Sequence, residues 1–88
     1  MQFEWDSEKA KANIAKHRVS FEEAKRFEFD SAYEYEDRDA FGEQRIVSIG
    51  FIGDTLHVMI YVERGDAVRV ISLRKAEKKE IRNYAKNV

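Results

Sequence analysis

The sequence predicts a single α+β domain with a mainly antiparallel sheet. The first observation is a change in hydrophobic period from helical to alternating after Asp30. The second is a pair of Gly-Asp steps, at residues 53–54 and 65–66, that separate runs of strand-forming residues as hairpin turns do. The third is a return to helical period near the C-terminus. With 88 residues the chain suffices for one domain and is too short for two, so the expected domain spans residues 1–88.

The N-terminal third of the chain predicts one short strand and two helices. Residues 2–5 alternate polar and aromatic side chains, which is typical of a half-buried strand. Asp6 or Ser7 is expected to cap a helix that ends at about Lys16. The second helix should cover residues 20–27, because its first four residues, Ser-Phe-Glu-Glu, form a capping box.

The remainder of the chain predicts consecutive strands and a final helix. Strands are expected at residues 32–36, 45–52, 56–63 and 67–73, a polar turn at 37–42, and a helix at 75–86. In the strand at 56–63, Val58 and Ile60 belong to the face expected to pack against helices, and Met59 and Tyr61 to a mixed face that could line a groove. The residues expected to be mostly buried are Trp5, Ile14, Phe27, Val58, Ile60 and Val70.

Composition excludes several classes of protein. The chain has no cysteine, which favours a reducing cytoplasm over secretion. Its longest apolar run, residues 58–62, is far shorter than the ~20 residues of a membrane span, so a soluble protein without a membrane partner is expected. His17 and His57 are far apart in sequence, and there is no phosphate-binding glycine motif. We therefore expect neither a metal nor a cofactor.

Charge is distributed unevenly along the chain. Seven acidic residues and one arginine lie between Glu28 and Glu43, whereas seven basic and two acidic residues lie between Arg69 and Lys86. This asymmetry predicts a polarised surface with a basic binding region. On the expected final helix the spacing of Lys75, Lys79, Arg82 and Lys86 puts them on one face. That face could bind phosphate, or it could simply be solvated.

Arg69, Arg74 and His17 are candidates for chemistry. The two arginines flank the apolar residues 70–73 of an expected central strand, where they could bind phosphate or pair with a carboxylate such as Glu43 or Glu63. His17 ends the first helix, where the helix dipole favours a cation and is expected to raise its pKa. A helix-capping role and a catalytic role both remain open for it.

Three blocks of the sequence, taken together, resemble the BrnT family, the toxins of a bacterial type II toxin–antitoxin system. The first block is Phe3-Glu4-Trp5-Asp6, Lys9, Asn13, Lys16-His17 and Val19-Ser20-Phe21-Glu22-Glu23-Ala24, followed by Phe29-Asp30. The second is Glu43-Gln44-Arg45 with Gly50, and the third is Arg69-Val70-Ile71-Ser72-Leu73-Arg74-Lys75-Ala76 with Lys79-Glu80 and Tyr84. The sequence departs from the family pattern at Arg18, Ser31 and Leu73, where glycine, proline and alanine are usual.

The resemblance implies a RelE-like fold and a ribonuclease toxin that stops translation. It also implies a cognate BrnA-like antitoxin, whose ribbon-helix-helix part binds operator DNA, so that this chain meets operator DNA only through the antitoxin. RNA is the implied substrate. Cleavage without a metal requires a base for the 2′-hydroxyl, positive charge beside the phosphate and an acid for the leaving 5′-oxygen.

On this basis we predict roles for eight residues. Arg69 and Arg74 are expected to stabilise charge in the transition state, with His17 as the acid or base, a role that a lysine or glutamate could also fill. The expected phosphate-binding residues are Lys16, Arg45, Lys75, Lys79 and Arg82. Three alternatives remain: a binding module for RNA or protein without catalysis, a toxin that acts by occupancy, and a basic surface that only grips the antitoxin.

Overall fold

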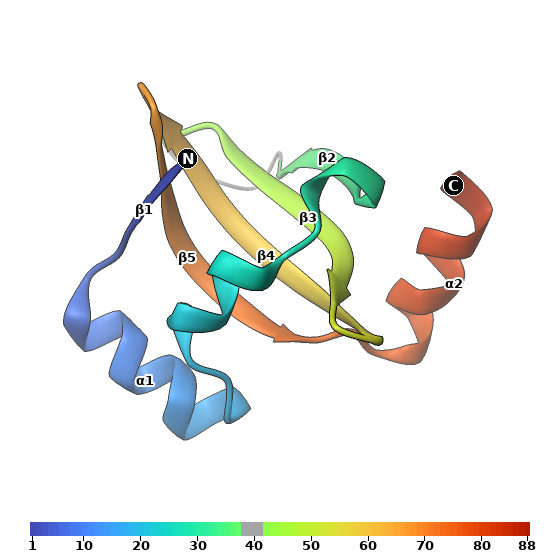
Figure 1. Cartoon of the computed structure of the whole chain (residues 1–88), viewed down its shortest axis with the longest axis horizontal. Coiled ribbons are helices and arrows are strands. Elements are labelled where there is room, and N and C mark those ends of the chain that lie inside the picture. Colours follow the sequence, from blue (N-terminus) through green and yellow to red (C-terminus); the bar gives the residue numbers. More distant parts are fainter. Residues whose placement is uncertain (38–41) are drawn as a thin grey trace.

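The computed structural model describes residues 1–37 and 42–88, and over these residues the chain forms a five-stranded sheet flanked by helices (Figure 1). The strands are β1 (Gln2–Glu4), β2 (Tyr33–Asp37), β3 (Arg45–Ile52), β4 (Thr55–Arg64) and β5 (Ala67–Lys75). The helices are α1 (Ser7–His17) and α2 (Lys78–Asn87), with two 3-10 helices, η1 (Phe21–Arg26) and η2 (Phe29–Ser31). The predicted α+β class is confirmed. Most of the predicted turn at 37–42 lies outside the described residues.

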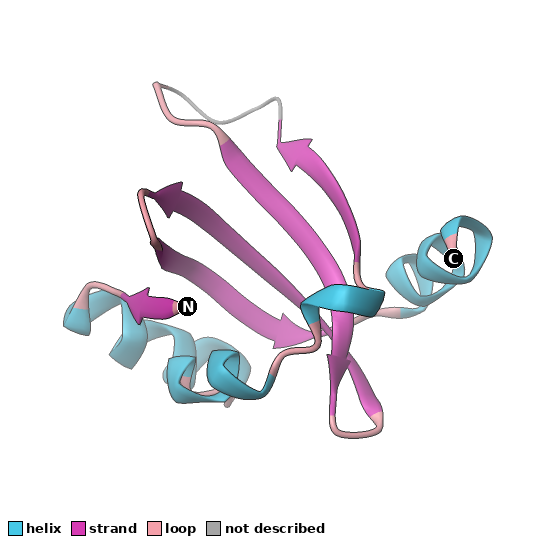
Figure 2. Cartoon of the chain, turned by 45° about the horizontal axis from the view of Figure 1, so that its top comes forward, coloured by secondary structure: helices cyan, strands magenta, loops and turns pink. Residues whose placement is uncertain are grey.

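The sheet is mainly antiparallel, as predicted. Its strand order is β1-β5-β4-β3-β2, and the three pairs among β2 to β5 are antiparallel. Both Gly-Asp steps form the predicted two-residue hairpins, and Gly53 and Gly65 have positive φ angles of 63° and 58°, which glycine adopts without strain. The pairing of β1 with β5 is parallel and was not predicted, because nothing local in three residues specifies their partner (Figure 1). Figure 2 shows the tight turn between β3 and β4 as a pink loop.

The helix after α1 differs from its prediction. Residues 21–26 form a 3-10 helix instead of an α-helix. The hydroxyl of Ser20 caps it by accepting from the N–H of Glu22 at 3.1 Å. The carboxylate of Glu23 accepts from Arg26 at 2.7 Å, which takes it away from the predicted capping box.

The ends of α1 and α2 are set by their neighbours. Asp6 caps α1 as predicted, with its carboxylate accepting from the N–H of Glu8 at 2.8 Å. Arg18 then adopts the left-handed conformation (φ 60°) that glycine usually supplies at this point. The final helix begins at Lys78 rather than residue 75, because β5 continues through Lys75, which pairs with His57.

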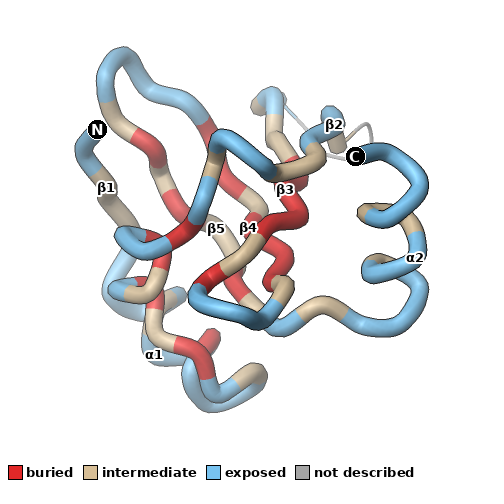
Figure 3. Tube along the Cα trace, turned by 45° about the vertical axis from the view of Figure 1, so that its right-hand side comes forward, coloured by how far each residue is buried: buried red, intermediate tan, exposed pale blue. Residues whose placement is uncertain are grey.

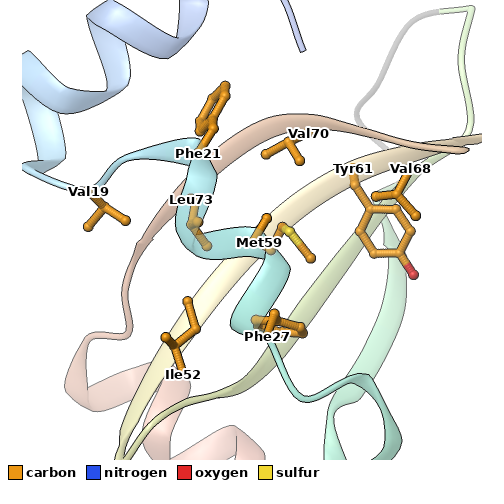
Figure 4. Packing of buried hydrophobic residues seen from close by; sticks show 10 residues of the cluster. Val19, Phe21, Phe27, Ile52, Met59, Tyr61, Val68, Val70 and Leu73 are labelled. Carbon is orange, nitrogen blue, oxygen red and sulfur yellow. The ribbon is translucent and has the colours of Figure 1, made fainter. Parts of the chain in front are cut away.

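The main core lies between the N-terminal helices and one face of the sheet (Figure 4). Phe21 from η1 packs there with Met59 and Leu73, which are fully buried. The other face carries a smaller cluster of Val47, Ile49 and Val58 under α2. The face predicted to line a groove is therefore the core face, and the prediction was wrong because both faces of β4 are covered.

The predicted core is partly confirmed. Phe27, Val58 and Val70 are buried, whereas Trp5 and Ile60 are half-buried. Ile14 was predicted incorrectly, because it is 48% exposed. On α1 the residue that turns toward the sheet is the neighbouring Asn13, and one residue along a helix is a rotation of ~100°. In Figure 3 the burial concentrates in the strands, while α1 and α2 are largely exposed.

Gly50 allows the N-terminal segment to approach β3 closely. A Cβ atom at this position would lie 2.8 Å from the ring of Phe27 and 3.0 Å from the Cβ of Ala32. Real Cβ atoms do not approach so closely, so this part of the core requires glycine.

Truncation of Leu73 should destabilise the fold strongly. We expect Leu73→Ala to lower the free energy of unfolding by about 2–5 kcal/mol, because a fully buried side chain leaves a cavity. Ile14→Ala is the matched control and should change it by about 0.5 kcal/mol or less. Urea unfolding of both variants measures the difference, and equal losses would contradict the core assignment.

Candidate active site

Arg69 and Arg74 lie on the same face of the sheet, the face that carries α2. Their partners on β4 are Val62 and Val58, which are four residues apart and therefore face the same side. Two residues five apart in a regular strand would face opposite sides. A bulge next to the pairing of Ile60 shifts the register of β5 and brings both arginines to one face.

Arg69 and Arg45 flank Val62 on this face. Arg69 pairs with Val62 on β4, and Arg45 lies on β3 next to Ile46, whose partner is Tyr61. We call Arg45 and Arg69 the arginine row. Both side chains are about one-third exposed, at 33% and 29%.

The arginine row has only loose ion pairs among the described residues. Arg69 lies 4.0 Å from Glu4 of β1, and Arg45 lies 3.8 Å from Glu43. The Nε of Arg45 is buried and has no hydrogen-bond partner there. Glu43, one predicted partner of Arg69, instead pairs with Arg45 and Arg64. Among the described residues, the guanidinium groups of the row thus make no close ion pair, which leaves them able to bind an anion.

Arg74 is held by a two-pronged ion pair with Glu80 of α2. Its Nη1 donates to Oε1 at 2.8 Å and its Nη2 to Oε2 at 2.5 Å, and the two side chains are 26% and 20% exposed. The same carboxylate accepts from the N–H of Glu77 at 2.8 Å and so caps α2. The hydrogen bonds between them raise the pKa of Arg74 and lower the pKa of Glu80. Glu80, rather than the predicted Glu43 or Glu63, is the partner.

A pocket of about 410 Å³ brings several predicted residues together. It is lined by Lys16, His17, Arg74, Lys75 and Glu77, and we call it the His17 pocket. Burial lowers the pKa of His17, and the charges of Lys16 and Arg74 lower it further. The prediction of a raised pKa was wrong, because these effects outweigh the helix dipole. A neutral imidazole near pH 7 can accept a proton.

Asn13 anchors α1 one turn before His17 and so positions His17 through the helix. Sequence analysis gave Asn13 no such role. Its side-chain amide donates to the carbonyls of Val19 (2.9 Å) and Leu73 (2.7 Å), and its oxygen accepts from the N–H of Leu73 (3.3 Å). His17 follows one helical turn later. The available signal was an asparagine, a poor helix former, inside an alanine-rich helix one turn before a histidine.

Lys79 and Arg82 lie in a separate groove between α2 and β2. The groove has a volume of about 450 Å³ and is lined by Tyr35, Lys79, Glu80, Arg82, Asn83 and Lys86, and we call it the α2 groove. Lys75 was predicted to join this stripe, but it belongs to β5 and lines the His17 pocket. Arg74 lines the His17 pocket and is paired with Glu80, which lines the α2 groove, so this ion pair connects the two hollows.

The predicted residues thus form three groups. Lys16, His17, Arg74 and Lys75 share the His17 pocket, Arg45 and Arg69 form the arginine row, and Lys79 and Arg82 line the α2 groove. Arg69 and Arg74 are separated by four residues of β4, or roughly 13 Å along the strand.

Within residues 1–37 and 42–88, no three His, Cys, Asp or Glu side chains gather in a way that could hold a metal ion. None of the helices in these ranges is both long and apolar enough to cross a membrane.

Arginines on one face of the sheet and a neutral histidine at its edge define a small protein equipped to bind phosphate and transfer protons. The family model of the ribonuclease toxin BrnT, of type II toxin–antitoxin systems, matches residues 5–80, and the chain belongs to this family. The crystal structure of the Brucella abortus ribonuclease toxin BrnT is similar, with 30% identity and a TM-score of 0.72 over 89% of this chain and 99% of that one. Comparison with curated proteins gave no match. RNA is therefore the substrate class, and an antitoxin is the partner.

Loss of the Arg74–Glu80 pair should be measurable as a pH-dependent loss of stability. The pKa of Glu80 is below its ordinary 4.5, so its contribution is complete above that pH and is lost as pH falls through the folded-state pKa. We expect Glu80→Gln to cost about 1.5–3 kcal/mol at pH 7 and progressively less below pH 4.5.

The control for this comparison is Glu22→Gln, which removes an exposed pair with Lys25. It should cost about 0.5 kcal/mol or less at any pH. Chemical denaturation from pH 3 to pH 7 gives both curves. A deficit in Glu80→Gln that did not vary with pH would show that the ion pair is not its cause.

Proposed function

We propose that this protein is a metal-independent endoribonuclease with a RelE-like fold, that its active centre is the His17 pocket, and that it stops translation by cutting RNA. The observation that carries the proposal is one pocket that combines a histidine of lowered pKa with three cationic side chains. These are the parts that cleavage by the RNA's own 2′-hydroxyl requires.

The proposed reaction begins with proton transfer from the 2′-hydroxyl to neutral His17. The 2′-oxygen then attacks the adjacent phosphorus, and the bond to the 5′-oxygen breaks, which leaves a 2′,3′-cyclic phosphate and a 5′-hydroxyl. Arg74 and Lys75 neutralise the charge that develops on the phosphorane. Lys16 and Lys75 are the ammonium donors in the pocket that can protonate the leaving oxygen.

The other two groups hold the rest of the strand. Arg69 lies roughly 13 Å from Arg74 along the sheet, so the arginine row can stabilise charge on a neighbouring phosphate of the same RNA while Arg74 holds the scissile one. Lys79 and Arg82 contact further phosphates in the α2 groove. In this scheme Arg74 can contact a phosphate while it stays paired with Glu80, because a guanidinium has five donors, of which Glu80 accepts two and the carbonyl of Lys75 a third.

The family supports the proposed biology. We propose a BrnA-like antitoxin with a ribbon-helix-helix part as the partner, contact with operator DNA only through that antitoxin, and a cytoplasmic location. An antitoxin that covers the His17 pocket or the α2 groove would block access of RNA. It would thereby silence the toxin without altering the toxin's own fold.

The purified protein should cleave RNA in excess EDTA at the rate seen without it. The proposed chemistry uses only side chains of this chain, so chelation removes nothing that it needs. Gel analysis of RNA incubated with and without EDTA measures the rates. Abolition by EDTA would refute metal independence, and binding without cleavage, with or without ribosomes, would favour a non-catalytic binding module.

Replacement of His17 should remove one limb of the pH–rate profile. A general base acts in its neutral form, so the wild-type rate should rise with pH through the pKa of His17, which lies below 6.5, and then level off. We expect His17→Gln to cleave about 10²–10⁴-fold more slowly and to lose this limb.

Lys11→Ala is the matched control on α1, because Lys11 is 79% exposed and lines none of the three groups. It should retain the wild-type rate and profile, and melting temperatures of both variants confirm that they fold. A folded His17→Gln variant with the wild-type profile would rule out His17 as the base.

A further inference from the structure

We propose that the α2 groove binds single-stranded RNA by stacking one base on the ring of Tyr35, and that this places the next part of the strand beside Arg74. The inference rests on the proposed function and deepens it. It gives Tyr35 a role in binding and specifies that the bound RNA is unpaired. The site has so far been described only by its charge.

The groove offers an aromatic face next to a row of cations. Tyr35 is 42% exposed and lines the groove, so its ring is accessible to a ligand there. Lys79, Arg82 and Lys86 follow at helical spacing along the adjacent side of α2. A basic groove combined with an exposed aromatic ring is the recurrent arrangement for unpaired nucleic acid, in which cations hold phosphates and rings hold bases.

The alternation of β2 puts Glu34 and Glu36 on the face opposite Tyr35, whereas Asp37 shares the face of Tyr35. Tyr35 pairs with Val47, which belongs to the cluster under α2, whereas Glu34 pairs with Ser48 on the opposite face. The carboxylate of Glu34 there accepts from the hydroxyl of Tyr61 at 2.8 Å. The sheet thus splits the acidic stretch seen in the sequence: Glu34 and Glu36 point away from the groove, and the acidic neighbours of Tyr35 on its own side are Asp37 and Glu80, which is paired with Arg74.

The ring of Tyr35 is supported by the neighbouring ring of Tyr33. The rings of Tyr33 and Tyr35 lie 5.7 Å apart at an angle of 39°, and Tyr33 packs against the buried cluster under α2. Burial raises the pKa of Tyr35, with Glu80 contributing, so the phenol stays neutral. A fixed, uncharged ring loses little conformational freedom when a base stacks on it.

The ring also connects the groove to the proposed chemistry. Tyr35 and Glu80 line the same groove, and Glu80 is paired with Arg74 of the His17 pocket, so a base on Tyr35 lies close to the residue that joins the two hollows. Bases in a duplex are stacked on each other and cannot lie on a protein ring, so this mode selects unpaired RNA. Phosphate contacts alone would not make that distinction.

The test is binding of a short RNA with 2′-O-methyl riboses, which cannot be cleaved, as a single strand and as a duplex. Tyr35→Ala should weaken binding of the single strand by about fivefold to a hundredfold, the loss of one stacked base, and leave duplex binding unchanged. Tyr35→Phe should bind the single strand as tightly as the wild type. Fluorescence anisotropy at several salt concentrations measures each affinity.

Two controls separate stacking from charge and from folding. Ile81→Ala removes a large side chain that is 45% exposed on α2 outside the groove, and it should not change binding. Lys86→Ala should flatten the salt dependence by about one phosphate contact, whereas Tyr35→Ala should leave that slope unchanged. Melting temperatures confirm that each variant is folded.

Wild-type affinity in a folded Tyr35→Ala variant, or equal affinity of the wild type for single strand and duplex, would overturn the proposal. Because the probe cannot be cleaved, the result is independent of catalysis. Binding through Tyr35 by a protein that cuts no RNA would support this inference and refute the proposed function. Wild-type binding by Tyr35→Ala alongside normal cleavage would refute this inference and support the proposed function.

Discussion

The hydrogen bonds of the Asn13 side chain join helix α1 to strand β5, and the arrangement of the rest of the molecule depends on this contact. Strand β1 pairs only with the first three residues of β5, so the edge of β5 beyond Arg69 has no strand partner from β1. Asn13 satisfies both backbone groups of Leu73 on that edge and the carbonyl of Val19. Unpaired peptide groups at a buried position cost ~1–3 kcal/mol each. This contact fixes α1 on the sheet and, one turn later, fixes His17 beside Arg74.

The features that follow from local rules were predictable from the sequence. The Gly-Asp hairpins, the cap at Asp6 and the strands they delimit came out as expected, because turn and cap preferences act over a few residues. The exposure of Ile14 was not predictable, because whether Ile14 or Asn13 faces the sheet is decided by a partner sixty residues away. Similarly, alternation in β4 defined two faces but could not tell which one the N-terminal helices would cover.

The residues of the candidate site were predictable from the sequence, but the way in which the fold groups them in space was not. Side-chain chemistry pointed to the arginines, lysines and His17, but a bulge in β5 decides that Arg69 and Arg74 share a face. The extension of β5 moves Lys75 from the helix stripe to the His17 pocket. The partner of Arg74 is equally a matter of tertiary geometry, since Glu80 reaches it only because α2 turns back across the sheet.

The order of the chain has a consequence for when this toxin can become active during its own synthesis. Strands β2 to β5 pair with sequence neighbours and can form early, since local contacts close short loops. The contact of Asn13 with Leu73 joins residues 60 positions apart. His17 therefore remains without Arg74 and Lys75 until β5 has left the ribosome and joined the sheet. A nascent chain that has not yet exposed β5 thus lacks the assembled His17 pocket.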